Sequence, residues 1–323
     1  MPLAALRSMT HWRCVHVVSV MLIVGAVALL ISKSTVIDRG RRHVTSAENC
    51  QRYSTSDEMS YILYGEGDNK SVYDRQLVDY VRSHISRPSP TRPRKLATPE
   101  KKDASQIGQS LFVDKLLSGR RNGFFVECGA ADGEYFSNSL FFELERNWTG
   151  VLIEANPEYH RSLLDKNRGA YVLQACLSTK QRPATLRLLP AGVLSGIVDN
   201  LHPTHLSFIG ANKGAEVTAN CFPLNTIMEA LGVSHVDYLS LDVEGPELEI
   251  LRTVDWNRLR VDVITVEYRI YGGRQIGIDV TATLKKLRDI RELFGNISIY
   301  QEVALLPHGV DAAGLDIVFV RRT

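Results

Sequence analysis

The sequence predicts an α/β fold with a mainly parallel sheet and an antiparallel edge, preceded by one membrane-spanning helix. Three observations lead to this prediction. From Gln106 onward, short apolar runs alternate with helical patterns, as in successive βαβ units. The last two apolar runs are joined by a short polar loop without a helix, so they should pair antiparallel. Residues 15–32 form a long apolar run without Asp, Glu, Lys or Arg.

The N-terminal apolar run, VHVVSVMLIVGAVALLIS, is close to the length that crosses a hydrocarbon core. A cleaved signal peptide would have a shorter apolar region, and an amphipathic helix would show a polar stripe. We therefore expect a short tail over residues 1–14 and a membrane anchor over residues 15–32. Positive charges flank the anchor on both sides, so charge leaves its orientation open. These charges are Arg7 and Arg13 before it, and Lys33, Arg39, Arg41 and Arg42 after it.

Residues 33–105 are expected to form a polar stem, and residues 106–323 the folded domain. The stem holds one short helical pattern within DRQLVDYVRSHI. Residues 87–102 are basic and rich in proline, which is typical of a solvated, semi-extended linker. The net charge of +2 over 323 residues does not favour nucleic acid as a partner, which would require a concentrated basic face.

Within the domain, the strands and helices are expected in the following order. The strands cover residues 123–128, 150–154, 170–176, 184–189, 217–222, 236–242, 262–267, 297–301 and 315–320. The helices cover residues 136–146, 158–167, 280–294 and a segment that begins at 246–251 with proline in its first turn.

Polar residues at the strand ends matter most, because ligands of open α/β sheets bind beyond the carboxyl ends of the strands. The first strand runs into ECGAADG, which contains Glu127, Gly129, Ala131 and Gly133. The two glycines would let the backbone approach a ligand closely. The second strand ends in Glu154, at a position that accepts hydrogen bonds from ribose hydroxyls in nucleoside-binding folds. Because the glycines read G-x-x-x-G rather than G-x-G-x-x-G, the pattern favours a nucleoside without a pyrophosphate.

More acids follow the later strands. Asp242 and Glu244 lie on the same side of an extended segment, DVEGPE, after the fourth strand, and Glu267 ends the fifth. Each acid alone could instead cap a helix or pair with an arginine such as Arg269. Together with the acids of the first two strands they would repel one another, unless a cationic ligand, basic side chains or a metal compensated them. No grouping of Cys and His has the spacing of zinc ligands, so no metal is assigned.

Long motifs in the domain resemble the FkbM-type methyltransferase domain. They are FFVECGAADGEYFSNSLFFELERNWTGVLIEANPEYHRSLLDKNR at 124–168, CLS at 176–178 and VDYLSLDVEGPELEILRTVDW at 236–256. SNSLFFE followed by WTGVLIE, with LVDYVRSH, SQIGQS and the anchor, is more narrowly similar to the Star-like membrane proteins of animals. The resemblance covers roughly residues 74–321. It implies a Rossmann-like class I methyltransferase fold and an activity that depends on S-adenosylmethionine.

The resemblance also implies roles for particular residues. Glu127, Gly129 and Gly133 would lie against the methionine part of S-adenosylmethionine, and Glu154 would match the ribose-binding acid. Contacts on the adenine side would come from Ser178 and its neighbours.

The D-x-E-G segment, here Asp242 to Gly245, would face the methyl group and the substrate. The chain has Glu127 where such folds often have Asp, and Leu241 where many relatives have Ile, but neither change removes a carboxylate.

Two functions are compatible with these features. One is an O-methyltransferase for a glycan or small hydroxylated acceptor, with Asp242 or Glu244 as the base and His202 or His205 as alternatives. The other is a non-catalytic escort, because Star-like proteins are type II membrane proteins implicated in moving cargo from the endoplasmic reticulum to the Golgi and through endosomes. The resemblance favours a lumenal or extracellular domain in the system of endoplasmic reticulum, Golgi, endosome and plasma membrane. That setting favours the escort, because S-adenosylmethionine is made in the cytosol and would have to be imported.

Two further patterns bear on the compartment. Sequons at Asn69, Asn147 and Asn296 would accept glycans only in a lumenal or extracellular domain. Four cysteines beyond the anchor allow three complete disulfide pairings, with buried free thiols as the alternative. These cysteines are Cys50, Cys128, Cys176 and Cys221.

Overall fold

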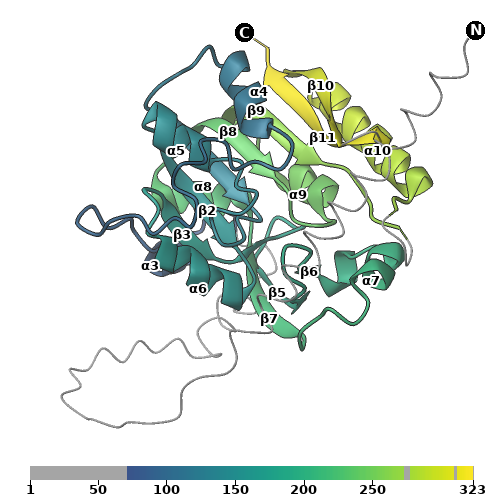
Figure 1. Ribbon diagram of the computed structural model, residues 1–323, viewed down its shortest axis with the longest axis horizontal. Coiled ribbons are helices and arrows are strands. Elements are labelled where there is room, and N and C mark those ends of the chain that lie inside the picture. The colour runs from purple at the N-terminus through teal and green to yellow at the C-terminus, as the bar shows by residue number, and fades with distance from the viewer. Residues whose placement is uncertain (1–70, 273–276, 309–310, 323) are drawn as a thin grey trace, which may run out of the picture. The chain divides into compact units, whose positions relative to one another are not determined.

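The computed structural model describes residues 71–272, 277–308 and 311–322 (Figure 1). The predicted tail and anchor, residues 1–32, lie outside the described residues, as do Cys50 and Asn69. Within the described ranges, no helix combines the length and the hydrophobicity needed to cross a bilayer.

The centre of the domain is a seven-stranded sheet with the order β10-β11-β9-β8-β1-β2-β3. Five neighbouring strands run parallel, namely β3, β2, β1, β8 and β9. Strand β11 pairs antiparallel with both β9 and β10. The predicted mainly parallel sheet and its antiparallel edge are therefore confirmed. The strands are β1 (Phe124–Cys128), β2 (Thr149–Glu154), β3 (Tyr171–Gln174), β8 (His235–Leu241), β9 (Arg260–Glu267), β10 (Tyr300–His308) and β11 (Asp311–Arg321).

Helices cover both faces of this sheet, because successive side chains of each strand point to opposite faces. On β1, for example, Val126 packs into one apolar core and Phe125 into the other. The first face carries α3 (Arg75–His84), α8 (Leu224–Leu231), α9 (Glu247–Thr253) and α10 (Val280–Ile297). The second carries α4 (Gln109–Leu116), α5 (Leu140–Arg146) and α6 (Pro157–Lys166) (Figure 1).

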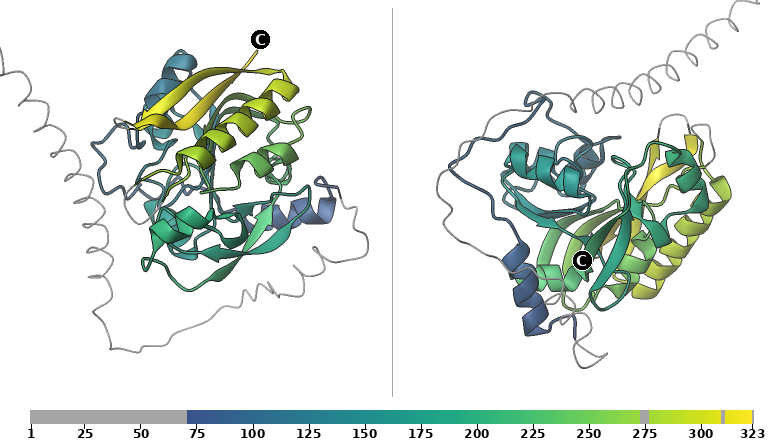
Figure 2. Two further views of the ribbon diagram at one scale, coloured as in Figure 1. Left: turned by 90° about the vertical axis from the view of Figure 1, so that its right-hand side faces the viewer. Right: turned by 90° about the horizontal axis from the view of Figure 1, so that it is seen from below.

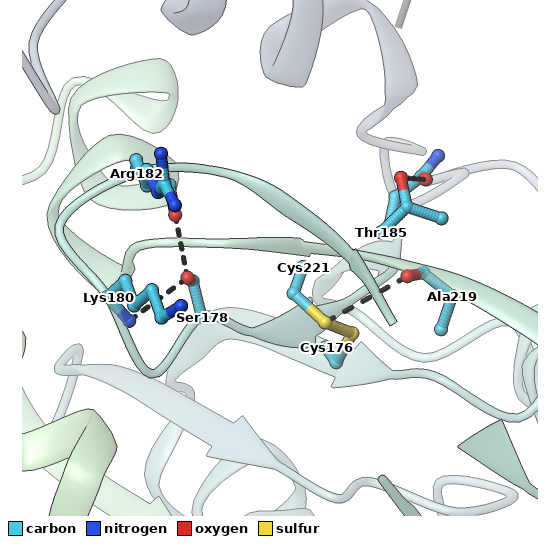
Figure 3. The surroundings of a disulfide bond; sticks show 8 residues. Cys176, Ser178, Lys180, Arg182, Thr185, Ala219 and Cys221 are labelled. Atoms are coloured by element: carbon cyan, nitrogen blue, oxygen red, sulfur yellow. Dashed lines mark hydrogen bonds between the residues drawn. A yellow bond between two sulfur atoms is a disulfide. The ribbon is translucent and has the colours of Figure 1, made fainter. Parts of the chain in front are cut away.

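A smaller sheet is inserted between β3 and β8, and it lies away from the β10–β11 edge (Figure 2). Its order is β4-β7-β5-β6, and Leu188, Ile197 and Ala219 help to form its own small core. A disulfide joins Cys176 to Cys221 across the β4–β7 pair (Figure 3). The segments are β4 (Cys176–Leu177), β5 (Ala184–Leu189), β6 (Gly196–Ile197), the short helix η1 (Val198–Asn200), α7 (Pro203–Ile209) and β7 (Val217–Phe222).

Several predicted boundaries shift for physical reasons. The expected strand over residues 170–176 is split, because the chain leaves the main sheet after Gln174 and Cys176 joins the smaller one. The expected helix over residues 136–146 begins at Leu140, since the preceding residues hydrogen-bond to the end of β1. The last helix continues to Ile297, so that β10 starts only at Tyr300.

Part of the predicted stem packs onto the domain. In α3, Leu77 and Val81 are almost fully buried in the core beside α8. The basic, proline-rich stretch that follows is mostly exposed, as expected. It is nevertheless fixed to the domain, because Arg94 pairs with Glu143 on α5 and the backbone of residues 97–98 donates to Glu134. Residues 75–98 are therefore part of the folded unit.

Candidate cofactor site

The carboxyl ends of β1, β2, β8 and β9 surround one hollow. Its empty volume is about 1160 Å³, a figure that includes the open space at its mouth. Most of the predicted site residues line this hollow, and most of those are acids at the ends of strands. They are Glu127, Gly129, Ala131, Glu154, Asp242, Glu244 and Glu267.

Gly129 forms the junction of three strand ends. Its N–H donates to the carbonyl of Ile153 on β2 at 3.0 Å, while the N–H of Asp242 donates to Cys128 at 3.2 Å. A Cβ atom on Gly129 would lie 1.8 Å from the backbone oxygen of Asp242, and the residue has a φ of +81°. Glycine is therefore required here, because both the conformation and the close approach exclude a side chain.

The carboxylate of Glu127 binds the chain that follows it. It accepts hydrogen bonds from the hydroxyl of Ser137 at 2.9 Å, from the N–H of Asn138 at 2.6 Å and from the hydroxyl of Ser139. Burial raises the pKa of Glu127, while Arg168 and these hydrogen bonds oppose that effect. Glu127 therefore shapes the wall of the hollow by holding residues 137–139 in place.

Glu154 lies at the end of β2 and is 7% exposed. Its two oxygens accept from the N–H of Ala131 at 2.8 Å and from the N–H of Asn156 at 2.6 Å. Burial raises the pKa of Glu154 to about 7, against the effect of these backbone hydrogen bonds. Each oxygen has a second lone pair, so the carboxylate can accept further donors from a ligand in the hollow.

Asp242, Glu244 and Glu267 form a cluster in which one carboxylate oxygen of each lies within 4.8 Å of the others. Burial, and then the neighbouring acids Asp316 and Glu247, raise the pKa of Asp242 to about 7. Burial and the other acids of the cluster also raise the pKa values of Glu244 and Glu267 well above the usual value. The cluster therefore resists carrying its full negative charge without a compensating cation.

Glu247 and Lys286 support the loop that carries two of these acids. Glu247 accepts hydrogen bonds from the N–H groups of Val243 and Gly245 at 3.0 and 3.1 Å, and Lys286 donates to its other oxygen at 2.5 Å. Both side chains are buried. Neither residue of this pair was predicted from the sequence. A signal was present, since Lys286 falls in the buried stripe of α10 beside Leu287.

Asn138 is a second residue that the sequence analysis did not assign. Its Nδ2 donates to the hydroxyl of Ser240 at 2.9 Å, and it lines the hollow. Its Oδ1 is buried and, in the described part of the chain, has no hydrogen-bond partner. Because buried polar atoms are nearly always paired, this oxygen is available to a donor on a ligand. The SNS sequence within the motif SNSLFFE was the available signal.

Four predicted residues lie elsewhere. Gly133 sits behind the hollow, where a Cβ atom would lie 2.3 Å from Leu163. Ser178 donates to the carbonyl of Arg182 inside a turn and does not line the hollow (Figure 3). His202 caps α7 by accepting from the N–H of Thr204.

His205, the fourth, is a buried residue rather than the exposed loop residue that is more usual for such a histidine. Its Nδ1 lies 3.5 Å from an oxygen of Glu244, and its Nε2 lies 3.3 Å from the carbonyl of Leu194. Burial lowers the pKa of His205, so the neutral imidazole predominates at pH 7.

The comparison with family models gives one match, the methyltransferase FkbM domain, over residues 127–295, which is more than half of the chain. The chain belongs to the FkbM methyltransferase domain family. The matched region begins at the first-strand acid and includes every strand end around the hollow. The FkbM assignment and the observed strand order together give a mixed α/β, Rossmann-like methyltransferase fold, as the motifs predicted.

Solved structures show only distant similarity. Fibrillarin from Aeropyrum pernix, in complex with S-adenosyl-L-methionine, is 10% identical with a TM-score of 0.38, over 67% of this chain and 74% of that chain. A human methyltransferase 10 domain containing protein is 9% identical with a TM-score of 0.34, over 76% and 95%. Precorrin-6y C5,15-methyltransferase from Geobacter metallireducens is 16% identical with a TM-score of 0.32, over 66% and 87%. None of the curated proteins compared with the chain matches it. The assignment rests on the family model.

Proposed function

We propose that the domain binds S-adenosylmethionine in the hollow and transfers its methyl group to a hydroxyl of a glycan or small acceptor. The observation that carries this proposal is the buried carboxylate of Glu154, which faces a hollow that is surrounded by further acids. A ligand with ribose hydroxyls, a sulfonium and an ammonium suits this arrangement, because the hydroxyls donate to Glu154 and the two cationic groups, which outweigh the ligand's one carboxylate, partly offset the acids.

The residues that line the hollow would have different roles. Glu154 would hold the ribose, and the backbone of Gly129 to Ala131 would face the methionine part. S-Adenosylmethionine supplies, when bound, an electrophilic methyl group on a sulfonium. Asp242 would accept the proton that the acceptor hydroxyl loses as its oxygen gains the methyl group, and would then release it to solvent. A carboxyl with a pKa of about 7 is suited to exchange a proton at neutral pH.

Binding is tested by calorimetry on the full-length chain in detergent. We expect saturable binding of S-adenosylmethionine and at least a tenfold loss of affinity in Glu154→Gln, about 1.4 kcal/mol or more. Glu158→Gln is the matched control, because Glu158 is exposed on α6 and does not line the hollow. Absence of binding at millimolar ligand would remove the cofactor from the proposal.

Transfer is tested with labelled methyl donor and a panel of hydroxylated glycans. We expect Asp242→Asn to lose transfer while it keeps cofactor binding, because it removes the base and leaves Glu154 in place. If transfer survives this substitution, Asp242 is not the base.

A second proposal concerns the biological setting. We propose that the chain is a Star-like, type II membrane protein whose lumenal domain escorts cargo from the endoplasmic reticulum to the Golgi and through endosomes. The Cys176–Cys221 disulfide supports an oxidising compartment, where such bonds persist. Asn147 and Asn296, the acceptors of the two described sequons, are exposed, which a glycan requires.

The two parts of this setting have separate tests. Endoglycosidase should shift the mobility of the full-length chain, and Asn147→Gln and Asn296→Gln should each reduce the shift. If no site carries a glycan, the lumenal placement loses this support. Removal of residues 15–32 should disturb cargo transport if the anchor is needed, and unchanged transport would contradict the escort function.

A further inference from the structure

The acids beyond β8 and β9 have the spacing of a cation site. One carboxylate oxygen from each of Asp242, Glu244 and Glu267 lies within 4.8 Å of the others. Mg²⁺ binds its oxygen ligands at about 2.0–2.1 Å, so that two of them are separated by at most about 4.2 Å. The three oxygens therefore lie close enough together for one ion to contact them all after a small adjustment of the side chains.

A second acidic group in the same domain shows how the protein neutralises such a cluster when no ligand is required. His235, Asp237 and Asp262 also bring their ligand atoms within 4.8 Å of one another. Arg120 contacts both aspartates, at 2.6 Å for Asp262, and the Nε of Arg260 lies 2.9 Å from Asp262. Arginine side chains therefore occupy the position that a cation would take in that group.

The cluster in the hollow has a different partner arrangement. Lys286 is the buried ammonium beside it, but its hydrogen bond at 2.5 Å goes to Glu247, a fourth carboxylate. His205 is the other basic side chain near the cluster, with its Nδ1 3.5 Å from an oxygen of Glu244. One ammonium group cannot offset four neighbouring carboxylates, so negative charge is left over when all of them are ionised.

An independent observation points to a ligand at this position. Glu267 is 2% exposed and lines the hollow, and its Oε2 has no hydrogen-bond partner among the described residues. An unpaired carboxylate oxygen in the interior is costly, and native proteins rarely leave one without a partner. The buried Oδ1 of Asn138, also without a partner among the described residues, lines the same hollow. Both atoms are oxygen acceptors, so the missing partner is a cation or a donor.

We propose that Asp242, Glu244 and Glu267 bind a hard divalent cation of the Mg²⁺ or Mn²⁺ type. Carboxylate oxygens select this class of ion, whereas zinc sites favour sulfur and nitrogen ligands. Three protein ligands leave positions for water or for an oxygen of a bound acceptor, as is usual for Mg²⁺. The cation site does not depend on the cofactor, because it is built from the chain's own side chains. A bound cation would hold Asp242 as an ionised ligand, so with the ion in place Asp242 would no longer serve as the base for methyl transfer.

The test is a titration of the full-length chain in detergent with Mn²⁺ and without S-adenosylmethionine. Binding is followed by the loss of the electron paramagnetic resonance signal of free Mn²⁺. We expect one saturable site per chain, competition by Mg²⁺ and at least a tenfold weaker affinity in Glu267→Gln. Glu292→Gln, the same chemical change at an exposed position on α10, should bind Mn²⁺ like the unchanged chain.

Thermal unfolding separates loss of the site from loss of the fold. Glu267→Gln removes a buried charge from an acidic group, so without metal it should unfold at the same temperature as the unchanged chain or higher. Mn²⁺ should raise the unfolding temperature of the unchanged chain and of Glu292→Gln, but not that of Glu267→Gln. Absence of saturable binding at millimolar Mn²⁺, or equal binding by Glu267→Gln, would overturn the proposal. Neither result bears on cofactor binding, which Glu154→Gln tests.

Discussion

The Nε of Arg168 lies 2.7 Å from Oε2 of Glu143, and both side chains are almost completely buried. Arg168 also donates to the hydroxyl of Ser139 and to the carbonyl of Gly133, so it joins α5 to the loop after β1. Although burial raises the pKa of Glu143, Arg168 and the N–H of Gly169 bring it below its usual value. This buried ion pair supports the strand-end loop from behind the hollow.

Replacement of Arg168 should therefore be severe. We expect Arg168→Met to lower the free energy of unfolding by about 3–5 kcal/mol, because it leaves the Glu143 charge buried without its main partner. Arg94→Met is the matched control, since the Arg94 side chain is 43% exposed and pairs with the same carboxylate, and it should cost about 0–1 kcal/mol. Urea denaturation measures both. Equal losses would show that Arg168 has no special role.

The junction at Gly129 should not tolerate a methyl group. Gly129→Ala should lower the free energy of unfolding by more than about 3 kcal/mol, because its Cβ would overlap the backbone of Asp242. Gly108→Ala has a similar φ of +86° with no atom within 4 Å, so it should cost only the conformational strain, about 1–2 kcal/mol. Thermal or urea unfolding of both variants gives the comparison, and similar losses would contradict the predicted overlap.

Glu134 should make the free energy of unfolding depend on pH. Although burial acts in the opposite direction, Lys166 and the N–H groups of Ala97 and Thr98 lower the pKa of Glu134 to about 2. An unfolded glutamate titrates near 4.3, so the stabilisation is complete above about pH 5 and is lost as the pH falls toward 2.

Glu134→Gln should thus cost about 2 kcal/mol at pH 7, and this difference from the unchanged chain should shrink as the pH falls below 5. Urea unfolding over a pH series measures the difference. A constant difference across the series would mean that the charge of Glu134 contributes nothing.

The Cys176–Cys221 disulfide should stabilise the smaller sheet. The bridged cysteines are 45 residues apart, and we expect the double variant Cys176→Ala, Cys221→Ala to lose about 2–4 kcal/mol of unfolding free energy. A reducing agent should bring the unchanged chain close to the variant and leave the variant unaffected. If reduction leaves the unfolding of the unchanged chain as it was, the bridge carries no stability.

Glu154 should make cofactor binding sensitive to pH. The pKa of this buried carboxyl is about 7, and only its ionised form keeps a further lone pair on each oxygen for ribose hydroxyls, beside the backbone N–H groups that both oxygens accept. The affinity for S-adenosylmethionine should therefore fall as the pH decreases below 7, by up to about tenfold per unit for one bound proton. Calorimetry from about pH 6 to pH 8 measures it. In Glu154→Gln the affinity should be lower and its pH dependence weaker.

Local patterns in the sequence were sufficient for the main sheet. Strands such as GVLIE and DVITVE are short apolar runs that end in an acid, so these strands and the antiparallel edge could be predicted, although the order of the strands within the sheet was not. The break in the third strand could not be predicted in this way. Cys176 joins the smaller sheet by a two-residue pairing with β7, and its partner Cys221 is remote in sequence.

The acids at the candidate site could be predicted from the sequence, but the residues that hold the surrounding loops in place could not. The ends of parallel strands meet at one edge, which is why Glu154 and Asp242 were expected to lie together. The roles of Asn138 and Lys286 depend on contacts between distant elements, namely the hydrogen bonds to Ser240 and to Glu247. Such pairings are fixed by tertiary packing and leave little trace in the periodicity of one chain.

The hollow has one wall from the smaller sheet and one from the seven-stranded sheet, and each wall packs on its own core. Leu188, Ser195 and Ile197 line the hollow from the insertion, while the acids belong to the seven-stranded sheet. Leu188 and Ile197 pack into a core separate from the one beneath the acids. Substitutions in the insertion can therefore alter the shape of the hollow without disturbing the core beneath the acids. Remodelling this one segment would therefore change what fits the hollow while the acids stay in place.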